Sequence, residues 1–146
     1  MSNTFGGNSN GKTGSGYSTK TVKTKDGRRI NLELLDTIGQ ETFRSLNKLC
    51  YKDSDCIVLG YDITCKSTFE NIKDYWISDV KSVFNPKLMY LIGCKKDRYL
   101  DEQVSSDEAK EFAEQNNLRF FEVSNKSNEG IKEFVEDLAN QIIIEF

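Results

Sequence analysis

Residues 55–62 read DCIVLGYD, an apolar run of strand length that ends in the polar residue Asp62. Runs of this kind, with little polar alternation, are typical of strands that are buried on both faces. Two further runs follow along the chain, KLMYLIG at 87–93 and RFFEV at 119–123. We therefore expect three buried strands that share one sheet, and these strands decide the fold class.

Helical patterns follow each of these runs. Ser67 with Glu70 and Ser105 with Glu108 have the spacing of a capping box, which predicts that helices begin at these two serines. A third helix is predicted over Gly130–Glu145. Apolar residues recur at helical spacing on the three helices: Phe69, Ile72, Trp76, Val80 and Val83, then Ala109, Phe112 and Ala113, then Ile131, Phe134, Val135, Leu138 and Ile142. This alternation predicts a three-layer α/β/α fold with a mostly parallel sheet.

The N-terminal part of the chain has a different pattern. Residues 1–18 are rich in Gly, Asn and Ser, so we expect a flexible segment there, followed by a single domain over 19–146. Residues 19–24 and 30–35 are β-prone and flank the pair Asp26-Gly27. A DG pair between two such stretches predicts a β-hairpin.

Composition excludes several classes of function. The chain has 146 residues, a net charge of -3 and no histidine, so neither a nucleic-acid-binding basic surface nor a histidine-based catalytic or metal site is expected. The N-terminus does not resemble a signal peptide, and no apolar run reaches the roughly 20 residues that span a membrane. The cysteines lack metal-ligand spacing, which favours free thiols in the cytoplasm: Cys50, Cys56, Cys65 and Cys94.

Short polar motifs stand at the ends of the predicted strands, where α/β sheets bind ligands. They are LLDTIGQETFRSL at 34–46, YDIT at 61–64, CKKD at 94–97 and SNK at 124–126, with STFENIK at 67–73 opening a helix. In this order the motifs resemble those of Rab-type small GTPases of the Ras superfamily. The resemblance runs from about residue 19 to the last residue. It implies a P-loop NTPase fold, GTP or GDP and Mg²⁺ as ligands, and a switch in vesicle-mediated protein transport.

The first motif would carry the hydrolytic chemistry. By resemblance, Asp36 would hold Mg²⁺ through water, the backbone N–H of Gly39 would approach the γ-phosphate, and Gln40 would orient the attacking water. An ordinary strand-to-loop turn is the alternative for these residue types. The resemblance also implies exchange, activating and effector proteins as partners.

The later motifs would read the base. By resemblance, Asp97 would accept hydrogen bonds from the guanine edge, and Lys95 would lay its alkyl stem along the ring. The family has asparagine where this chain has Cys94, and a thiol is a poor substitute for an amide. Ser124 would support Asp97, with Asn125 and Lys126 beside the base. The alternatives are a solvated charge cluster at 95–97 and a polar turn at 124–126.

Residues 6–13, GGNSNGKT, match the phosphate-binding pattern G-x-x-x-x-G-K-T. In a working loop Gly6 and Gly11 permit the tight wrap, Lys12 meets the phosphates and Thr13 binds Mg²⁺. No clear strand precedes this match and no clear helix follows it, so a chance match is an open alternative. Residues 13–22 also resemble the family's switch I and the strand after it.

A first strand and first helix of the fold are therefore missing from the pattern. In the family that strand lies centrally, between the strands at 30–35 and 55–61, so the sequence predicts a gap there. An open apolar edge invites pairing with another chain. The residues QIIIEF at 141–146 contain no cysteine for a prenyl anchor, so membrane contact is expected only through partners. A degenerate, non-catalytic pseudo-GTPase module and a non-functional gene remnant remain alternatives to the switch.

Overall fold

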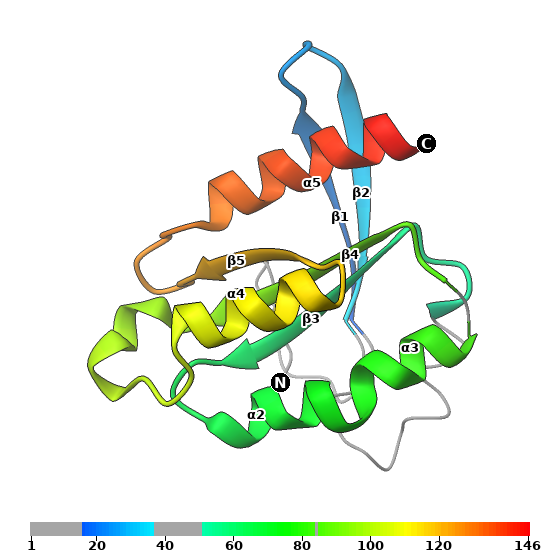
Figure 1. Cartoon of the computed structure of the whole chain (residues 1–146). Coiled ribbons are helices and arrows are strands. Elements are labelled where there is room, and N and C mark those ends of the chain that lie inside the picture. Colours follow the sequence, from blue (N-terminus) through cyan, green and yellow to red (C-terminus); the bar gives the residue numbers. More distant parts are fainter. Residues whose placement is uncertain (1–15, 37–50, 84) are drawn as a thin grey trace.

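The structure is a computed structural model that describes residues 16–36, 51–83 and 85–146. Its strands are β1 (Tyr17–Lys23), β2 (Arg29–Leu35), β3 (Cys56–Asp62), β4 (Leu88–Cys94) and β5 (Arg119–Val123). Its α-helices are α2 (Lys66–Asn71), α3 (Ile77–Val83), α4 (Ser106–Gln115) and α5 (Ile131–Glu145). Figure 1 shows their arrangement. The alternation of strands and helices from residue 56 onward confirms the predicted α/β class.

The three predicted buried strands form one parallel sheet in the order β3-β4-β5. Cys56 pairs with Leu88 at one end of β3, and Asp62 pairs with Cys94 at the other. Every residue of the middle strand β4 is buried. This explains why the sequence of β4 is an unbroken apolar run, because both faces of the strand lie in a core.

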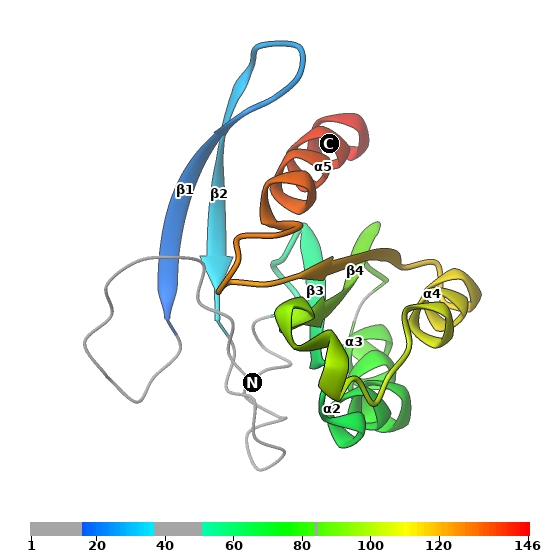
Figure 2. The same ribbon diagram turned by 90° about the vertical axis from the view of Figure 1, so that its left-hand side faces the viewer.

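Different elements cover the two faces of this sheet. On one face Leu59 and Leu91 pack with Phe69 of α2 and Ala109 of α4. On the other face, the core of Tyr90 and Ile92 includes residues of α5 and of the hairpin: Phe134, Leu138, Val22 and Leu32. Figure 2 shows the hairpin standing beside α5, away from α2, α3 and α4. The predicted layers are thus present, with the hairpin completing the α5 side.

The predicted hairpin is also present. β1 and β2 pair antiparallel, from Tyr17 with Leu35 to Lys23 with Arg29. At the turn, Gly27 has φ 87° and its N–H donates to the Thr24 carbonyl at 3.0 Å. Glycine adopts a positive φ without steric cost, which explains why the Asp26-Gly27 pair predicts this turn.

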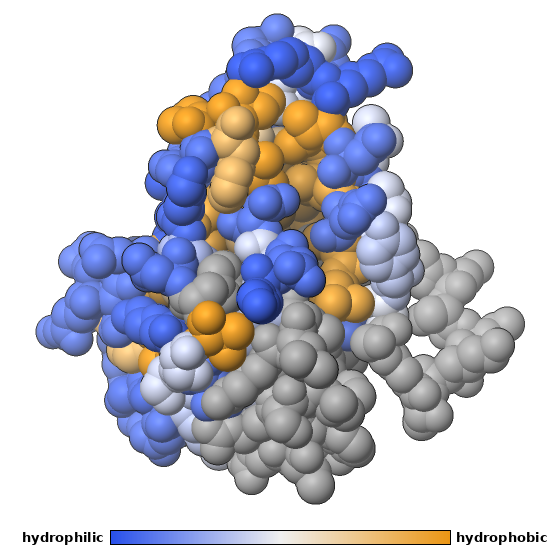
Figure 3. Space-filling view, turned by 90° about the vertical axis from the view of Figure 1, so that its right-hand side faces the viewer, coloured by the Kyte–Doolittle hydropathy of each residue, from blue (hydrophilic) through white to orange (hydrophobic). Residues whose placement is uncertain are grey.

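The hairpin and the parallel sheet are separate sheets. Among the described residues, no strand pairing connects β2 with β3. Leu35 of β2 and Val58 of β3 are 43% and 44% exposed. Figure 3 shows hydrophobic side chains gathered on the surface below the hairpin turn. Within the described residues the hairpin therefore contributes no strand to the parallel sheet.

The two capping-box predictions had different outcomes. Ser105 is the N-cap of α4, where its hydroxyl accepts from the Glu108 N–H, as predicted. The prediction at Ser67 was wrong, because α2 begins at Lys66 and its N-cap, Cys65, makes no side-chain cap. The Lys66 N–H instead donates to Oε1 of Gln103 at 3.1 Å. A side chain from a distant loop thus satisfies the helix terminus that a local serine was expected to cap.

The part of the chain that the structure describes contains no helix with the length and hydropathy needed to cross a membrane.

Candidate functional site

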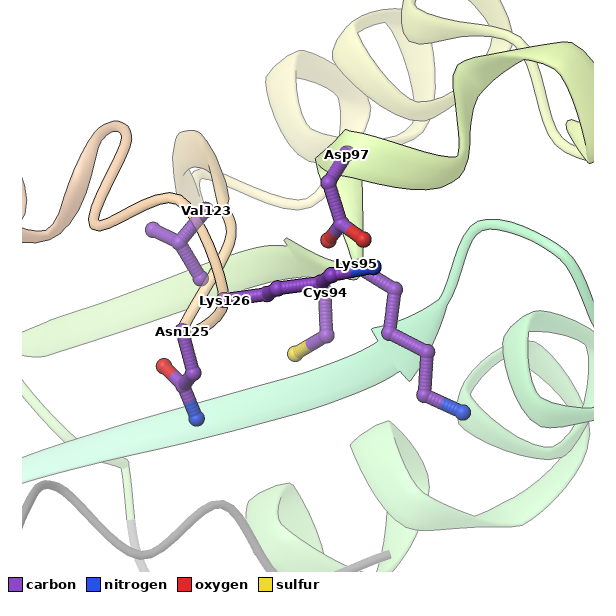
Figure 4. A pocket seen from close by; sticks show the side chains of 6 residues that line it. All are labelled: Cys94, Lys95, Asp97, Val123, Asn125 and Lys126. Carbon is purple, nitrogen blue, oxygen red and sulfur yellow. The ribbon is translucent and has the colours of Figure 1, made fainter.

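The loops that leave β4 and β5 enclose a pocket at the carboxyl end of the parallel sheet. Figure 4 shows the side chains that line it: Cys94, Lys95, Asp97, Val123, Asn125 and Lys126. Five of these six residues belong to the sequence-predicted base-reading motifs, and Val123 was not predicted. The pocket has a volume of about 280 Å³, at the lower limit of the roughly 300–1,000 Å³ typical of ligand sites.

Asp97 is held by a hydrogen bond from Ser124. The Ser124 hydroxyl, which is fully buried, donates to Oδ1 of Asp97 at 2.6 Å. The same oxygen of Ser124 accepts from the Ser127 N–H at 3.1 Å. The predicted support of Asp97 by Ser124 is thus present. One carboxylate oxygen is fixed by the protein, and the other has no protein partner among the contacts of the described residues.

Lys95 lies on one side of the pocket and makes an ion pair outside it. Its Nζ is 2.6 Å from Oδ2 of Asp62, the last residue of β3. Its backbone is left-handed, with φ 65° and ψ 38°, which is uncommon for a residue other than glycine. In Figure 4 the Lys95 side chain extends toward the end of β3, away from Asn125 and Lys126. Asp62 stands in the motif YDIT at 61–64, whose pattern alone predicts no role for it.

Cys94 ends β4 at the floor of the pocket. Its side chain is 5% exposed, and its thiol lies 3.8 Å from the Ile92 carbonyl oxygen. A thiol is a weak donor and a weak acceptor, so this residue supplies less polar recognition than an amide would. Burial raises the pKa of the Cys56 thiol to about 12. The latter thiol therefore remains protonated, as expected of a structural cysteine.

Asn125 and Lys126 enter from the loop after β5, and both are exposed. Figure 4 places Asn125 across the pocket from Lys95, with Cys94 between them. Asp97 gives the pocket a carboxylate, and the alkyl stems of Lys95 and Lys126 line it together with Cys94 and Val123. This combination suits a flat, uncharged ring with hydrogen-bond donors on its edge.

Among the residues predicted to carry the hydrolytic chemistry, Asp36 is the one that the structure describes. It follows β2, where its N–H donates to the Gly16 carbonyl at 2.8 Å. Burial raises the pKa of its carboxyl group. Asp36 does not line the base pocket. The remaining predicted phosphate, water and metal residues lie outside the described residues: Gly6, Gly11, Lys12, Thr13, Gly39 and Gln40.

A magnesium ion has only partial support from this chain's side chains. Within residues 16–36, 51–83 and 85–146, no three candidate ligands cluster as a metal site. Asp36 fits as a single ligand, because a cation beside a carboxylate offsets its burial. Magnesium is commonly held by one or two carboxylates together with substrate phosphates. The described residues are therefore compatible with a shared site that nucleotide phosphates complete.

A comparison with known families agrees with this geometry. The model of the Ras family matches residues 1–144. The chain belongs to the Ras family, and its fold is that of a Ras-like small GTPase domain with a parallel sheet.

Its relatives include several Rab-type proteins. The chain is 36% identical over 140 residues to Ras-related protein Rab-2B of Dictyostelium discoideum. It is 34% identical over 126 residues to Ras-related protein SEC4 of Candida albicans. The alignments cover 95% and 86% of this chain, but 68% and 60% of those relatives. Ras-related protein Rab-21 of Homo sapiens is 34% identical over 118 residues, which cover 80% of this chain and 52% of that relative.

Proposed function

We propose that this chain is a Rab-like small GTP-binding protein that binds guanine nucleotides and hydrolyses GTP slowly. The base would occupy the pocket between Lys95 and Lys126, with Asp97 accepting from its edge. By resemblance, Gln40 would orient the attacking water, and Thr13 and Asp36 would hold Mg²⁺ beside the phosphates. As a single small-GTPase-like domain over 19–146, the protein would act in the cytoplasm as a switch in vesicle transport, read by exchange, activating and effector proteins.

One observation carries this proposal, namely the hydrogen bond from Ser124 to Asp97 at the pocket. It orients the carboxylate so that its second oxygen, together with the remaining lone pair of the first, is available to two neighbouring donors. Guanine presents such a pair, a ring N–H and an exocyclic amino group, on one edge, whereas adenine does not. Hydrogen bonds to a charged acceptor are worth about 1.5–3 kcal/mol each, which is enough to select one base over the other.

The test is calorimetric titration of the purified protein with GDP and Mg²⁺, with ADP and Mg²⁺ as the matched control. The proposal expects a dissociation constant of about 1 μM or lower for GDP, at least a hundredfold weaker binding of ADP, and loss of GDP binding in Asp97→Ala. A folded protein that gives no heat with GDP would contradict the proposal.

Hydrolysis needs a separate measurement, because binding does not demonstrate it. Single-turnover conversion of GTP to GDP should be slow and should fall further in Gln40→Ala, while GDP affinity stays the same. Equal rates in the two proteins would remove Gln40 from the mechanism.

A non-catalytic interaction module is a second candidate function. Two observations favour it: Cys94 in the base-reading loop, and the separation of β2 from β3 among the described residues. In that case the protein would keep the family's surface but bind nucleotide weakly. The calorimetric titration separates the two candidates, because only the switch requires tight and guanine-selective binding.

A further inference from the structure

Asp62 stands at the carboxyl end of β3, next to the pocket but not in its lining. Its side chain is only 6% exposed, and Oδ2 lies 2.6 Å from Nζ of Lys95. Lys95 does line the pocket. A buried carboxylate at the end of β3 therefore contacts a residue that would touch the base.

The Asp62 carboxylate is fixed by several donors. Oδ1 accepts from the Thr64 N–H at 2.9 Å and from the Thr64 hydroxyl at 2.7 Å, which leaves Oδ2 for Lys95. The backbone adds a link, since the Ile63 N–H donates to the Cys94 carbonyl at 3.2 Å. Burial alone would raise the pKa of Asp62, but the Lys95 and Thr64 contacts outweigh it and the pKa is lowered. The group is therefore an anion held in one orientation.

This anchoring determines where Lys95 lies. A lysine side chain has four rotatable bonds, and an unanchored one loses that freedom when a ligand packs against it. Here the backbone is held in the left-handed region and the ammonium is held by Asp62, so both ends of the side chain are fixed. The alkyl stem between them is preorganised along one side of the pocket, where a flat ring can pack on it.

We propose that Asp62 is a positioning residue of the guanine site, which acts by holding the Lys95 side chain in place for the base. This inference rests on the proposed function and adds a residue to it. Asp62 itself touches neither base nor phosphate in this account.

A double-mutant cycle tests the inference. Wild type, Asp62→Asn, Lys95→Met and the double variant are titrated with GDP and Mg²⁺ in a calorimeter. Asparagine keeps an acceptor for Thr64 but loses the ion pair, and methionine keeps an alkyl stem but has no ammonium. Asp62→Asn should weaken GDP binding about five- to tenfold when Lys95 is present. In the Lys95→Met background the same change should have less than a twofold effect.

A merely structural role would give a different result. Damage to the loop by Asp62→Asn would weaken GDP binding equally in both backgrounds, and that outcome would overturn the inference. Glu129→Gln is the matched control. It breaks a neighbouring ion pair, in which Nζ of Lys96 lies 3.1 Å from Oε1 of Glu129. Neither residue of that pair lines the pocket, so GDP affinity should be unchanged.

A second measurement needs no nucleotide. Acetylation of lysine amines by an N-hydroxysuccinimide ester, followed by mass spectrometry, reports how well Lys95 is held. Labelling of Lys95 should rise at least threefold in Asp62→Asn, while labelling of Lys126 stays constant. Unchanged Lys95 labelling would overturn the inference even if GDP binds. If the wild type binds no GDP, the proposed function and the guanine-site role fail together, and changed labelling would then show only a structural ion pair.

Discussion

The Ser124 hydroxyl donates a 2.6 Å hydrogen bond to Oδ1 of Asp97, and this bond joins the loop after β5 to the loop after β4. Ser124 is fully buried. The orientation of the Asp97 carboxylate therefore depends on a residue from the loop after the next strand of the sheet.

Ser124→Ala should weaken GDP binding roughly tenfold, because Asp97 loses a hydrogen bond worth about 1.5–3 kcal/mol when the acceptor is charged. Calorimetry with GDP measures the loss. Ser106→Ala is the control, since Ser106 donates to Oε1 of Glu122, also at 2.6 Å, but outside the pocket. That variant should lower the melting temperature and leave GDP affinity unchanged. Equal affinities for wild type and Ser124→Ala would contradict the role of Ser124.

Cys94→Asn should strengthen GDP binding about tenfold, because an amide at the pocket floor supplies the donor and acceptor that a thiol lacks. Cys94→Ala serves as the comparison, since it removes the thiol without adding polarity and should change the affinity less than threefold. The thermal melt of each variant is recorded alongside. A stable Cys94→Asn protein with unaltered affinity would show that this position does not contact the ligand.

Two buried tyrosines should respond oppositely to loss of the hydroxyl. The Tyr61 hydroxyl is buried and has no hydrogen-bond partner among the described residues, whereas the Tyr90 hydroxyl donates to Oδ2 of Asp137 at 2.7 Å. Tyr61→Phe should therefore leave the free energy of unfolding unchanged or raise it by about 1 kcal/mol, and Tyr90→Phe should lower it by about 1–2 kcal/mol. Chemical denaturation measures both. If Tyr61→Phe destabilised the protein as much as Tyr90→Phe, the Tyr61 hydroxyl would have to make a hydrogen bond in the folded protein, and this prediction would be wrong.

Two glycines with positive φ should differ in their tolerance of alanine. Gly130 precedes α5 at φ 74°, and an added Cβ would collide with the Glu122 carbonyl oxygen. Gly27 in the hairpin turn has φ 87° and open space around it. Gly27→Ala should cost about 1 kcal/mol for the left-handed backbone alone, and Gly130→Ala about 3 kcal/mol or more because a clash is added. Similar melting temperatures for the two variants would be inconsistent with the packing at Gly130.

The parallel sheet and its helices could be predicted because their signals are local. The run in β4 is apolar throughout since both of its faces are buried, and Ser105 caps the helix that follows it. The prediction at Ser67 failed because Gln103, distant in sequence, satisfies the start of α2. A capping motif in the sequence does not show whether a distant side chain will bind the first N–H groups of the helix instead.

The residues of the site also differ in whether the sequence alone could predict their arrangement. Five of the six residues that line the pocket stand in two short motifs at strand ends, so their types and order were enough to bring them together. The pairing of Asp62 with Lys95 could not be read from the sequence, because it depends on adjacent parallel strands ending in register. Asp36 lies after β2, in the other sheet, and no described contact joins it to the base pocket.

The central claim, that Asp97 reads guanine, is tested most directly by exchanging its acceptor for a donor. In Asp97→Asn the amide oxygen can still accept from Ser124, while the amino group can donate to the 2-oxo group of xanthine. Wild type and Asp97→Asn are each titrated with GDP and with xanthosine diphosphate. If Asp97 reads guanine, the affinity of the variant for GDP should fall at least a hundredfold, and its affinity for xanthosine diphosphate should rise at least tenfold. A folded variant that still prefers GDP, or that binds neither nucleotide differently from the wild type, would contradict this claim.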